Sequence, residues 1–184
     1  MENLKSVIEA LILASEAPLA MDKICLIMEG VERTEIKKNI EQLTAEYNER
    51  QGGIFLAEVA GGFQFRTRPE FSSWIKKLKG TKPASLSPAA LETLAIVAYR
   101  QPLVKSEIES IRGVDVSAPL KGLLEKKLIR IVGRKDVPGK PIIYGTTKKF
   151  LEVFNLKDLS ELPTLRELKE LNGPAEPSPE LSNP

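Results

Sequence analysis

The sequence contains no histidine and only one cysteine, Cys25, among its 184 residues. Histidine is the commonest general base and the commonest metal ligand, and a structural zinc cluster needs several thiolates or imidazoles. One cysteine cannot form an internal disulfide. Because Cys25 stands in the apolar stretch from Ile24 to Met28, we interpret it as a small buried side chain. The sequence therefore predicts no catalytic residues, no metal, no cofactor and a reducing, cytoplasmic environment.

Other chemical motifs are missing as well. The sequence has no glycine-rich phosphate loop and no dinucleotide fingerprint, and no apolar run approaches the roughly 20 residues that span a bilayer. Glu2 and Glu9 stand where a secretory signal would be basic, so we expect no signal peptide. Glu107 and Glu109 are two residues apart and diverge on a helix. A carboxylate-dependent hydrolase that uses them stays open as an alternative.

Charge is unevenly distributed, although the net charge is only +2. Residues 1–80 contain 11 basic and 12 acidic side chains, residues 84–155 contain 12 and 7, and the last 29 residues contain 3 and 6. Only the middle block has the electrostatic character that attracts nucleic acid, and its excess of positive charge is modest.

The first 80 residues predict three helices followed by a β-hairpin. Apolar residues recur at helical spacing, and Asn3 can cap the first helix. The Gly61-Gly62 pair lies between β-prone segments and predicts a two-residue turn, in which both positions need positive φ. The helices are expected at about residues 3–15, at 21–28, and from 33 to the Gly52-Gly53 pair, with the hairpin at 54–67.

A fourth helix is expected at about residues 70–78. Its apolar residues share one side and are Phe71, Trp74, Ile75 and Leu78. We expect this side to pack against the first domain, and we interpret Trp74 as a core or interface residue rather than a ligand site.

The second half predicts the same order of elements. Ser87 followed by Pro88 is a typical helix cap and first turn. Helices are expected at about residues 88–100, 105–111 and 117–127, strands at 129–133 and 142–146, and a last helix at 147–154. The fold class is therefore mainly α with small β-hairpins, an α+β protein of two tandem winged-helix domains. The domains are expected at residues 1–80 and 87–160, with a linker at 81–86 and a C-terminal tail at 161–184 that is disordered from about 172.

The helix at 88–100 is apolar on nearly every side, with Glu92 as the only charge between its ends. Such a helix must be buried on nearly every side, and a domain of about 70 residues covers only part of it. Two interpretations stay open: neighbouring elements cover the rest, or a partner docks there.

Winged helices often bind DNA, so a DNA-binding transcription factor or architectural protein is the main alternative function. The third helix of the second domain lacks the Arg, Asn and Gln residues that read bases. The loop of the second hairpin is more basic, and Arg134, Lys135 and Lys140 could make weak contacts with the DNA backbone. Basic hairpin loops are also common on proteins that bind no DNA.

Two long segments carry a resemblance. Residues 86–114, LSPAALETLAIVAYRQPLVKSEIESIRGV, resemble the signature of the bacterial segregation and condensation protein B family. Residues 133–156, GRKDVPGKPIIYGTTKKFLEVFNL, resemble it as well, and residues 60–71 do so more loosely. The resemblance covers nearly all of the chain except the tail. Lys140 departs from the pattern, since arginine is more usual there.

The resemblance implies a non-enzymatic adaptor in chromosome condensation, chromosome partition and cell division. Members of this family are homodimers, formed chiefly through the N-terminal domain. They bind the kleisin subunit, segregation and condensation protein A, and through it the SMC ATPase. The expected location is the cytoplasm, in association with the nucleoid, with no membrane contact, no small-molecule substrate and weak or absent direct DNA contact.

No motif marks the kleisin contact, and we expect it on the C-terminal domain. The candidate residues are Tyr99, Gln101, Pro102, Arg112, Gly113, Arg134, Gly139, Pro141 and Tyr144. Each of them could instead maintain the fold: Gly113 and Gly139 as turn residues, and Tyr144 as a core residue.

Overall fold

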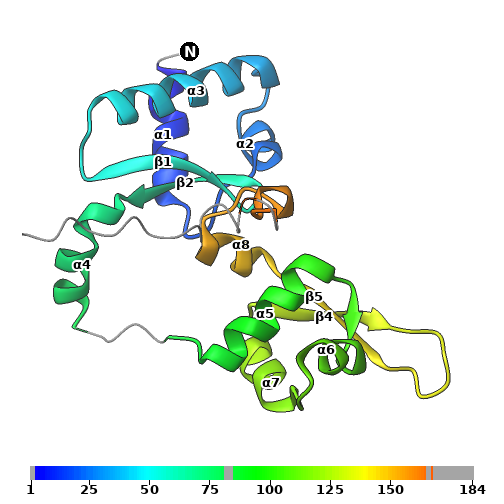
Figure 1. The fold of residues 1–184 in the computed structure, drawn as a ribbon. Coiled ribbons are helices and arrows are strands. Elements are labelled where there is room, and N and C mark those ends of the chain that lie inside the picture. Colours follow the sequence, from blue (N-terminus) through cyan, green and yellow to red (C-terminus); the bar gives the residue numbers. More distant parts are fainter. Residues whose placement is uncertain (1–2, 81–84, 165–166, 168–184) are drawn as a thin grey trace, which may run out of the picture.

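The computed structural model describes residues 3–80, 85–164 and 167, and it has two hydrophobic cores (Figure 1). Around each core, three helices are followed by an antiparallel hairpin, so the expected α+β fold of two tandem winged-helix domains is confirmed. Of the expected linker, only Ser85 and Leu86 are described. The tail predicted to be disordered from about residue 172 lies outside the described residues.

The N-terminal domain follows the predicted order. Its elements are α1 (Leu4–Ala14), α2 (Met21–Ile27), α3 (Arg33–Glu49), β1 (Ile54–Val59) and β2 (Gly62–Thr67). The Asn3 side chain caps α1 by accepting a hydrogen bond from the Ser6 backbone N–H, as expected. The apolar stripes of α1 and α3 meet in the core, where Ile8 and Ile36 are fully buried. Cys25 is only half-buried.

The hairpin turn lies one residue earlier than the sequence predicted. Val59 pairs with Gly62, so the two turn residues are Ala60 and Gly61, with φ angles of 53° and 74°. Gly62 instead begins β2 beside the connection between α1 and α2. A Cβ atom on Gly62 would lie 2.8 Å from backbone carbon atoms of Pro18 and Leu19. Glycine is therefore favoured at position 61 because the backbone has a positive φ, and at position 62 because the neighbouring backbone leaves no room for a side chain.

The expectation that the fourth helix packs against the first domain is wrong. A short 3₁₀ turn, η1 (Pro69–Phe71), leads into α4 (Ser72–Lys79), and none of the eight residues of α4, all of them described, is buried. Trp74 is 68% exposed and Leu78 is 87% exposed, so Trp74 is not a core residue. The helix projects away from the α1–α3 core (Figure 1), because the hairpin and α3 already close that core.

The C-terminal domain contains one strand that the sequence did not predict. Its elements are α5 (Pro88–Arg100), β3 (Leu103–Val104), α6 (Lys105–Arg112), α7 (Ser117–Glu125), β4 (Ile129–Arg134), β5 (Ile142–Thr146), α8 (Lys148–Phe154) and the 3₁₀ turn η2 (Leu159–Glu161). The short β3 pairs antiparallel with β5, which gives the sheet order β3-β5-β4. Ser87 caps α5 as expected. Within the described residues, no helix is long and apolar enough to cross a membrane.

Helix α5 partly fits both interpretations of its apolar sequence. Leu94 and Val97 lie in the core of the C-terminal domain, with Ala90, Thr93 and Ala98 also buried. Leu91 and Tyr99 remain 47% and 43% exposed. The home core therefore covers one side of the helix and leaves an apolar strip on the other.

The two domains touch where the first hairpin meets the segment after α8. The backbone N–H groups of Ala60 and Gly61 donate to the carbonyl oxygens of Leu156 and Lys157, at 2.9 and 3.1 Å. The Lys157 ammonium also lies 2.8 Å from the Glu58 carboxylate. The tip of the N-terminal wing is thus bound directly by the C-terminal part of the chain.

Candidate partner-binding surfaces

The exposed side of α5 forms the first candidate surface. Leu91, Ala95 and Tyr99 are all exposed and follow one another at intervals of four residues. Residues four apart on a helix are neighbours, so they make a strip about 12 Å long at 1.5 Å per residue. The Tyr99 hydroxyl donates to the Pro163 carbonyl at 2.7 Å, which fixes the end of the strip. We call this surface the α5 strip.

Gln101 is a structural residue at the C-terminal end of α5. Its side-chain oxygen accepts a hydrogen bond from the Thr146 backbone N–H at 2.7 Å, and its amide nitrogen donates to the Thr146 hydroxyl at 2.9 Å. These bonds tie the helix to β5. Pro102 follows in a cis peptide and is exposed, whereas Tyr144 pairs with Leu103 and is only 8% exposed. Tyr144 is therefore a core residue.

Arg112 and Gly113 lie at the opposite end of α5 from Tyr99. The Arg112 guanidinium donates to the Ala89 carbonyl and the Thr93 hydroxyl, both at 3.2 Å, and its side chain is 11% exposed. It thus joins the end of α6 to the first turns of α5. Gly113 ends α6 with a φ of 72°, a conformation that favours glycine.

The second wing supplies the remaining expected site residues. The Arg134 guanidinium donates to the Lys140 carbonyl at 3.1 Å, and the Lys135 N–H donates to the Pro141 carbonyl at 2.9 Å, so these residues hold the loop closed. Gly139 has a φ of 83° and open space around it, consistent with a turn residue.

Lys135 is only partly available for DNA because its ammonium lies 3.1 Å from the Glu107 carboxylate. Glu107 also accepts the Val104 backbone N–H at the start of α6. This backbone bond, and then the Lys135 contact, lower the pKa of the Glu107 carboxyl below its ordinary value. The charged pair therefore fastens the wing to α6.

The nine expected residues do not form one site. Tyr99, Gln101 and Pro102 lie at one end of α5 and Arg112 and Gly113 at the other, while Arg134, Gly139 and Pro141 belong to the wing and Tyr144 to the core. Of these places, the α5 strip and the wing offer exposed side chains. The sequence motifs could not show this, because each of the two segments that resemble the family mixes structural residues with surface residues.

Sequence reasoning missed a basic hollow on the C-terminal domain. It has a volume of about 520 Å³ and is lined by side chains from α7 through α8, among them Lys127, Arg130, Lys148 and Lys149. The pairing of Ile129 with Thr146 brings the segments that carry these residues side by side. The Lys149 ammonium lies 3.1 Å from the Glu152 carboxylate. In the sequence they are up to 22 residues apart, so only the strand register could have indicated the cluster.

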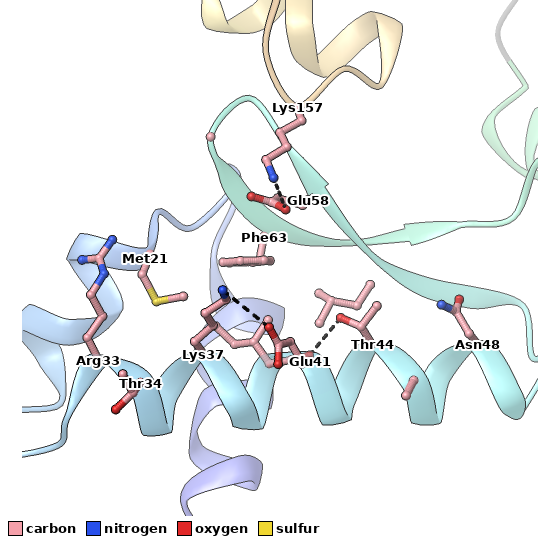
Figure 2. Close-up of a pocket in the computed structure, with 14 residues that line it drawn as sticks. Met21, Arg33, Thr34, Lys37, Glu41, Thr44, Asn48, Glu58, Phe63 and Lys157 are labelled. Carbon is pink, nitrogen blue, oxygen red and sulfur yellow. Dashed lines mark hydrogen bonds and ion pairs between the residues drawn. The ribbon is translucent and has the colours of Figure 1, made fainter. Parts of the chain in front are cut away.

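Sequence reasoning also missed a groove of about 780 Å³ on the N-terminal domain (Figure 2). Polar side chains of α3 line one wall at intervals of three and four residues: Thr34, Lys37, Glu41, Thr44 and Asn48. The other wall is the hairpin, with the Glu58–Lys157 ion pair at its end. Lys37 lies 3.8 Å from Glu41 within the groove. The polar stripe of α3 was a visible signal, but a solvated helix face has the same pattern.

Three carboxylates on and just after α6, those of Glu107, Glu109 and Asp115, have structural partners. Glu109 accepts the Val116 backbone N–H at 3.2 Å, whereas Glu107 serves the start of α6, so the two carboxylates do not form a pair. Hydrogen bonds from Ser117, and then from Lys105, hold the pKa of the Asp115 carboxyl well below its usual range. In the described ranges, no group of three His, Cys, Asp or Glu residues is placed to hold a metal ion.

These observations define a class: a tandem winged-helix protein with exposed apolar and charged surfaces. Residues 6–165 match the model of the family "Segregation and condensation complex subunit ScpB". Segregation and condensation protein B of Syntrophotalea carbinolica is 44% identical over 95% of this chain and 88% of its own length. The homolog from Coxiella burnetii is 46% identical over 92% of this chain and 82% of its own length.

The chain therefore belongs to the ScpB family, and the expected resemblance is confirmed. Among solved structures, it is similar to a dimer of a ScpB N-terminal domain complexed with a ScpA peptide. That similarity is 33% in sequence over 40% of this chain and 91% of the other chain, with a TM-score of 0.37.

Proposed function

We propose that the chain is a non-enzymatic adaptor in chromosome condensation and segregation during cell division. In this role it is a cytoplasmic, nucleoid-associated homodimer that binds the kleisin ScpA and, through it, the SMC ATPase. The observation that carries the proposal is family membership over residues 6–165, which include both winged-helix domains. The sequence has no glycine-rich phosphate loop, which agrees with a role in which ATP hydrolysis belongs to the SMC partner.

We place the kleisin contact on the C-terminal domain, at the α5 strip. Leu91 and Tyr99 offer apolar anchors that the home core leaves exposed, and such anchors at helical spacing fit an amphipathic partner helix. Pro102 extends the surface at the end of α5, and the wing with Arg134 and Lys140 adds charged groups. The groove along α3 is a second candidate binding site for the same partner, and its volume of about 780 Å³ supports this role.

Titration calorimetry of the full chain with the ScpA of the same cell tests this placement. We expect Leu91→Glu to weaken binding at least about tenfold, because a charge replaces an apolar anchor in a desolvated contact. Val153→Glu is the matched control, since Val153 is 54% exposed on α8. Weakening by Lys37→Glu in the groove, with Leu91→Glu binding normally, would move the contact to the N-terminal domain. No binding by the unaltered chain would reject the function itself.

The alternative of a DNA-binding protein is supported by the basic hollow around Lys127, Arg130 and Lys148. Helix α7, the helix that would read DNA bases in a winged-helix protein, is less suited to DNA binding. Its Lys121 lies 4.0 Å from Glu125, and the described helix contains no Arg, Asn or Gln. A gel shift at about 150 mM salt separates the two functions. The adaptor should retard DNA weakly and without sequence preference, whereas tight, selective retardation would favour the alternative.

A further inference from the structure

Helix α4 carries an apolar face without a partner in the described chain. Trp74 and Leu78 are 68% and 87% exposed, and Phe71 is 37% exposed. Together with the half-buried Ile75, these residues follow the i, i+3, i+4, i+7 spacing of a contact face. Exposed apolar side chains are normal when scattered, but a face of this size on one short helix marks an interaction surface.

The helix is presented in a fixed direction. Just before it, the Arg68 guanidinium donates to the Gly52 carbonyl at 2.8 Å and to the Tyr47 carbonyl at 3.1 Å, which anchors the chain to the end of α3. The same guanidinium lies over the Phe55 ring, 5.7 Å from its centroid. These contacts hold the base of α4 on its own domain while the rest of the helix extends from it.

A second apolar surface, which no other part of the described chain covers, lies on the same domain in a groove between α1 and α2. It has a volume of about 510 Å³, and its lining includes Val7, Leu11, Ile27, Val31 and Glu29. Val7 and Ile27 are 45% and 50% exposed. α4 leaves the domain on the side away from α2 (Figure 1), so a helix anchored at Arg68 does not reach the groove of its own chain.

The charges of the two surfaces are complementary. Residues 72–79 contain three lysines and no acidic residue, whereas residues 3–71 contain 8 basic and 11 acidic side chains. The helix thus carries a charge of +3 and the body of the domain −3. Two α4 helices packed on each other would bring like charges together, whereas α4 on the body of a second copy brings opposite charges together.

We propose that α4 of one copy inserts its Trp74–Leu78 face into the α1–α2 groove of a second copy, and that the second copy returns the same contact. This inference rests on the proposed homodimer and names the surfaces that form it. A two-fold axis makes both contacts equivalent and satisfies both apolar surfaces of each chain. Four apolar side chains bury roughly 500 Å², so a helix and a groove per chain approach the roughly 800 Å² per partner of a standard interface.

Mixing two variants of the full chain tests the reciprocal contact. Leu78→Glu disables the helix and Ile27→Glu disables the groove, and both residues are exposed, so the fold should be retained. In light scattering coupled to size exclusion, each variant alone should dissociate at least about 100-fold more readily than the unaltered dimer. The mixture should recover dimers, because one intact helix still meets one intact groove. Val153→Glu again serves as the control.

Trp74 is the only tryptophan of the chain, so its fluorescence reports directly on α4. We expect its emission to shift to shorter wavelength as the dimer forms, and to stay red-shifted in the Ile27→Glu variant alone. Dimers of both variants, or a mixture that stays monomeric, would overturn the reciprocal contact while leaving the proposed function intact. A monomeric unaltered chain would overturn the homodimer as well.

Discussion

At the scale of single residues, Arg112 shows how a charged side chain can serve the fold instead of a partner. Its guanidinium is nearly buried and bonds the Ala89 carbonyl and the Thr93 hydroxyl, while Glu92 pairs with it from a side chain that is 64% exposed. Thr93 is itself fully buried and also donates to the Ala89 carbonyl. The three groups form one network that fixes the angle between α5 and α6.

We expect Arg112→Ala to lower the free energy of unfolding by about 2 kcal/mol, because hydrogen bonds from a charged donor are lost in a desolvated place. Urea denaturation of the full chain measures this change. Glu92→Gln is the control and should cost less than about 1 kcal/mol, since the Glu92 side chain itself is largely solvated. If stability were unchanged and ScpA binding were weakened, Arg112 would instead belong to the partner-binding site, as expected from the sequence.

At the scale of elements, the hairpin of the N-terminal domain gives different roles to Gly61 and Gly62, which the sequence predicted to be equivalent turn residues. Gly61 is a turn residue, and left-handed backbone costs an L-residue about 1 kcal/mol. Gly62 has ordinary extended backbone, but the Pro18–Leu19 connection leaves no room for a Cβ.

We therefore expect Gly62→Ala to destabilise the chain by about 3 kcal/mol, because backbone atoms must move apart. Gly61→Ala should cost only about 1 kcal/mol. Thermal unfolding followed by circular dichroism gives both values, and Gly122→Ala on α7, with open space around it, is a control. A larger loss at Gly61 than at Gly62 would contradict the observed turn.

The features that the sequence could predict depend on neighbours in the chain, and those that it could not predict depend on distant contacts. Periodicity and caps such as Asn3 and Ser87 predicted the helices, because they depend on neighbours in the chain. The position of α4 and the strand β3 depend on distant contacts. No residue of α4 is buried in the core of its domain. Leu103 becomes a strand residue only by pairing with Tyr144. The candidate surfaces also depend on distant contacts, since Arg130 and Lys148 line one hollow only in the observed β4–β5 register.

At the scale of the whole molecule, the N-terminal wing and the segment after α8 act as a joint between the domains. Two backbone hydrogen bonds, the Glu58–Lys157 ion pair and a 3.1 Å bond from Arg66 to Asn155 form this joint. It also closes one end of the α3 groove, because Glu58 and Lys157 line it (Figure 2). The relative placement of the domains and the shape of the groove are thus set by the same few contacts.

Reversing one charge of the joint should separate the domains. Because small interdomain interfaces hold domains weakly, Glu58→Lys beside Lys157 should increase the radius of gyration measured by small-angle X-ray scattering. The double exchange of Glu58→Lys with Lys157→Glu should restore the compact value, since it recreates the attraction with opposite polarity. Glu41→Lys, a charge reversal elsewhere in the groove, should leave the value unchanged. An unaltered radius for Glu58→Lys would show that the two backbone bonds at Ala60 and Gly61 hold the domains without help from the ion pair.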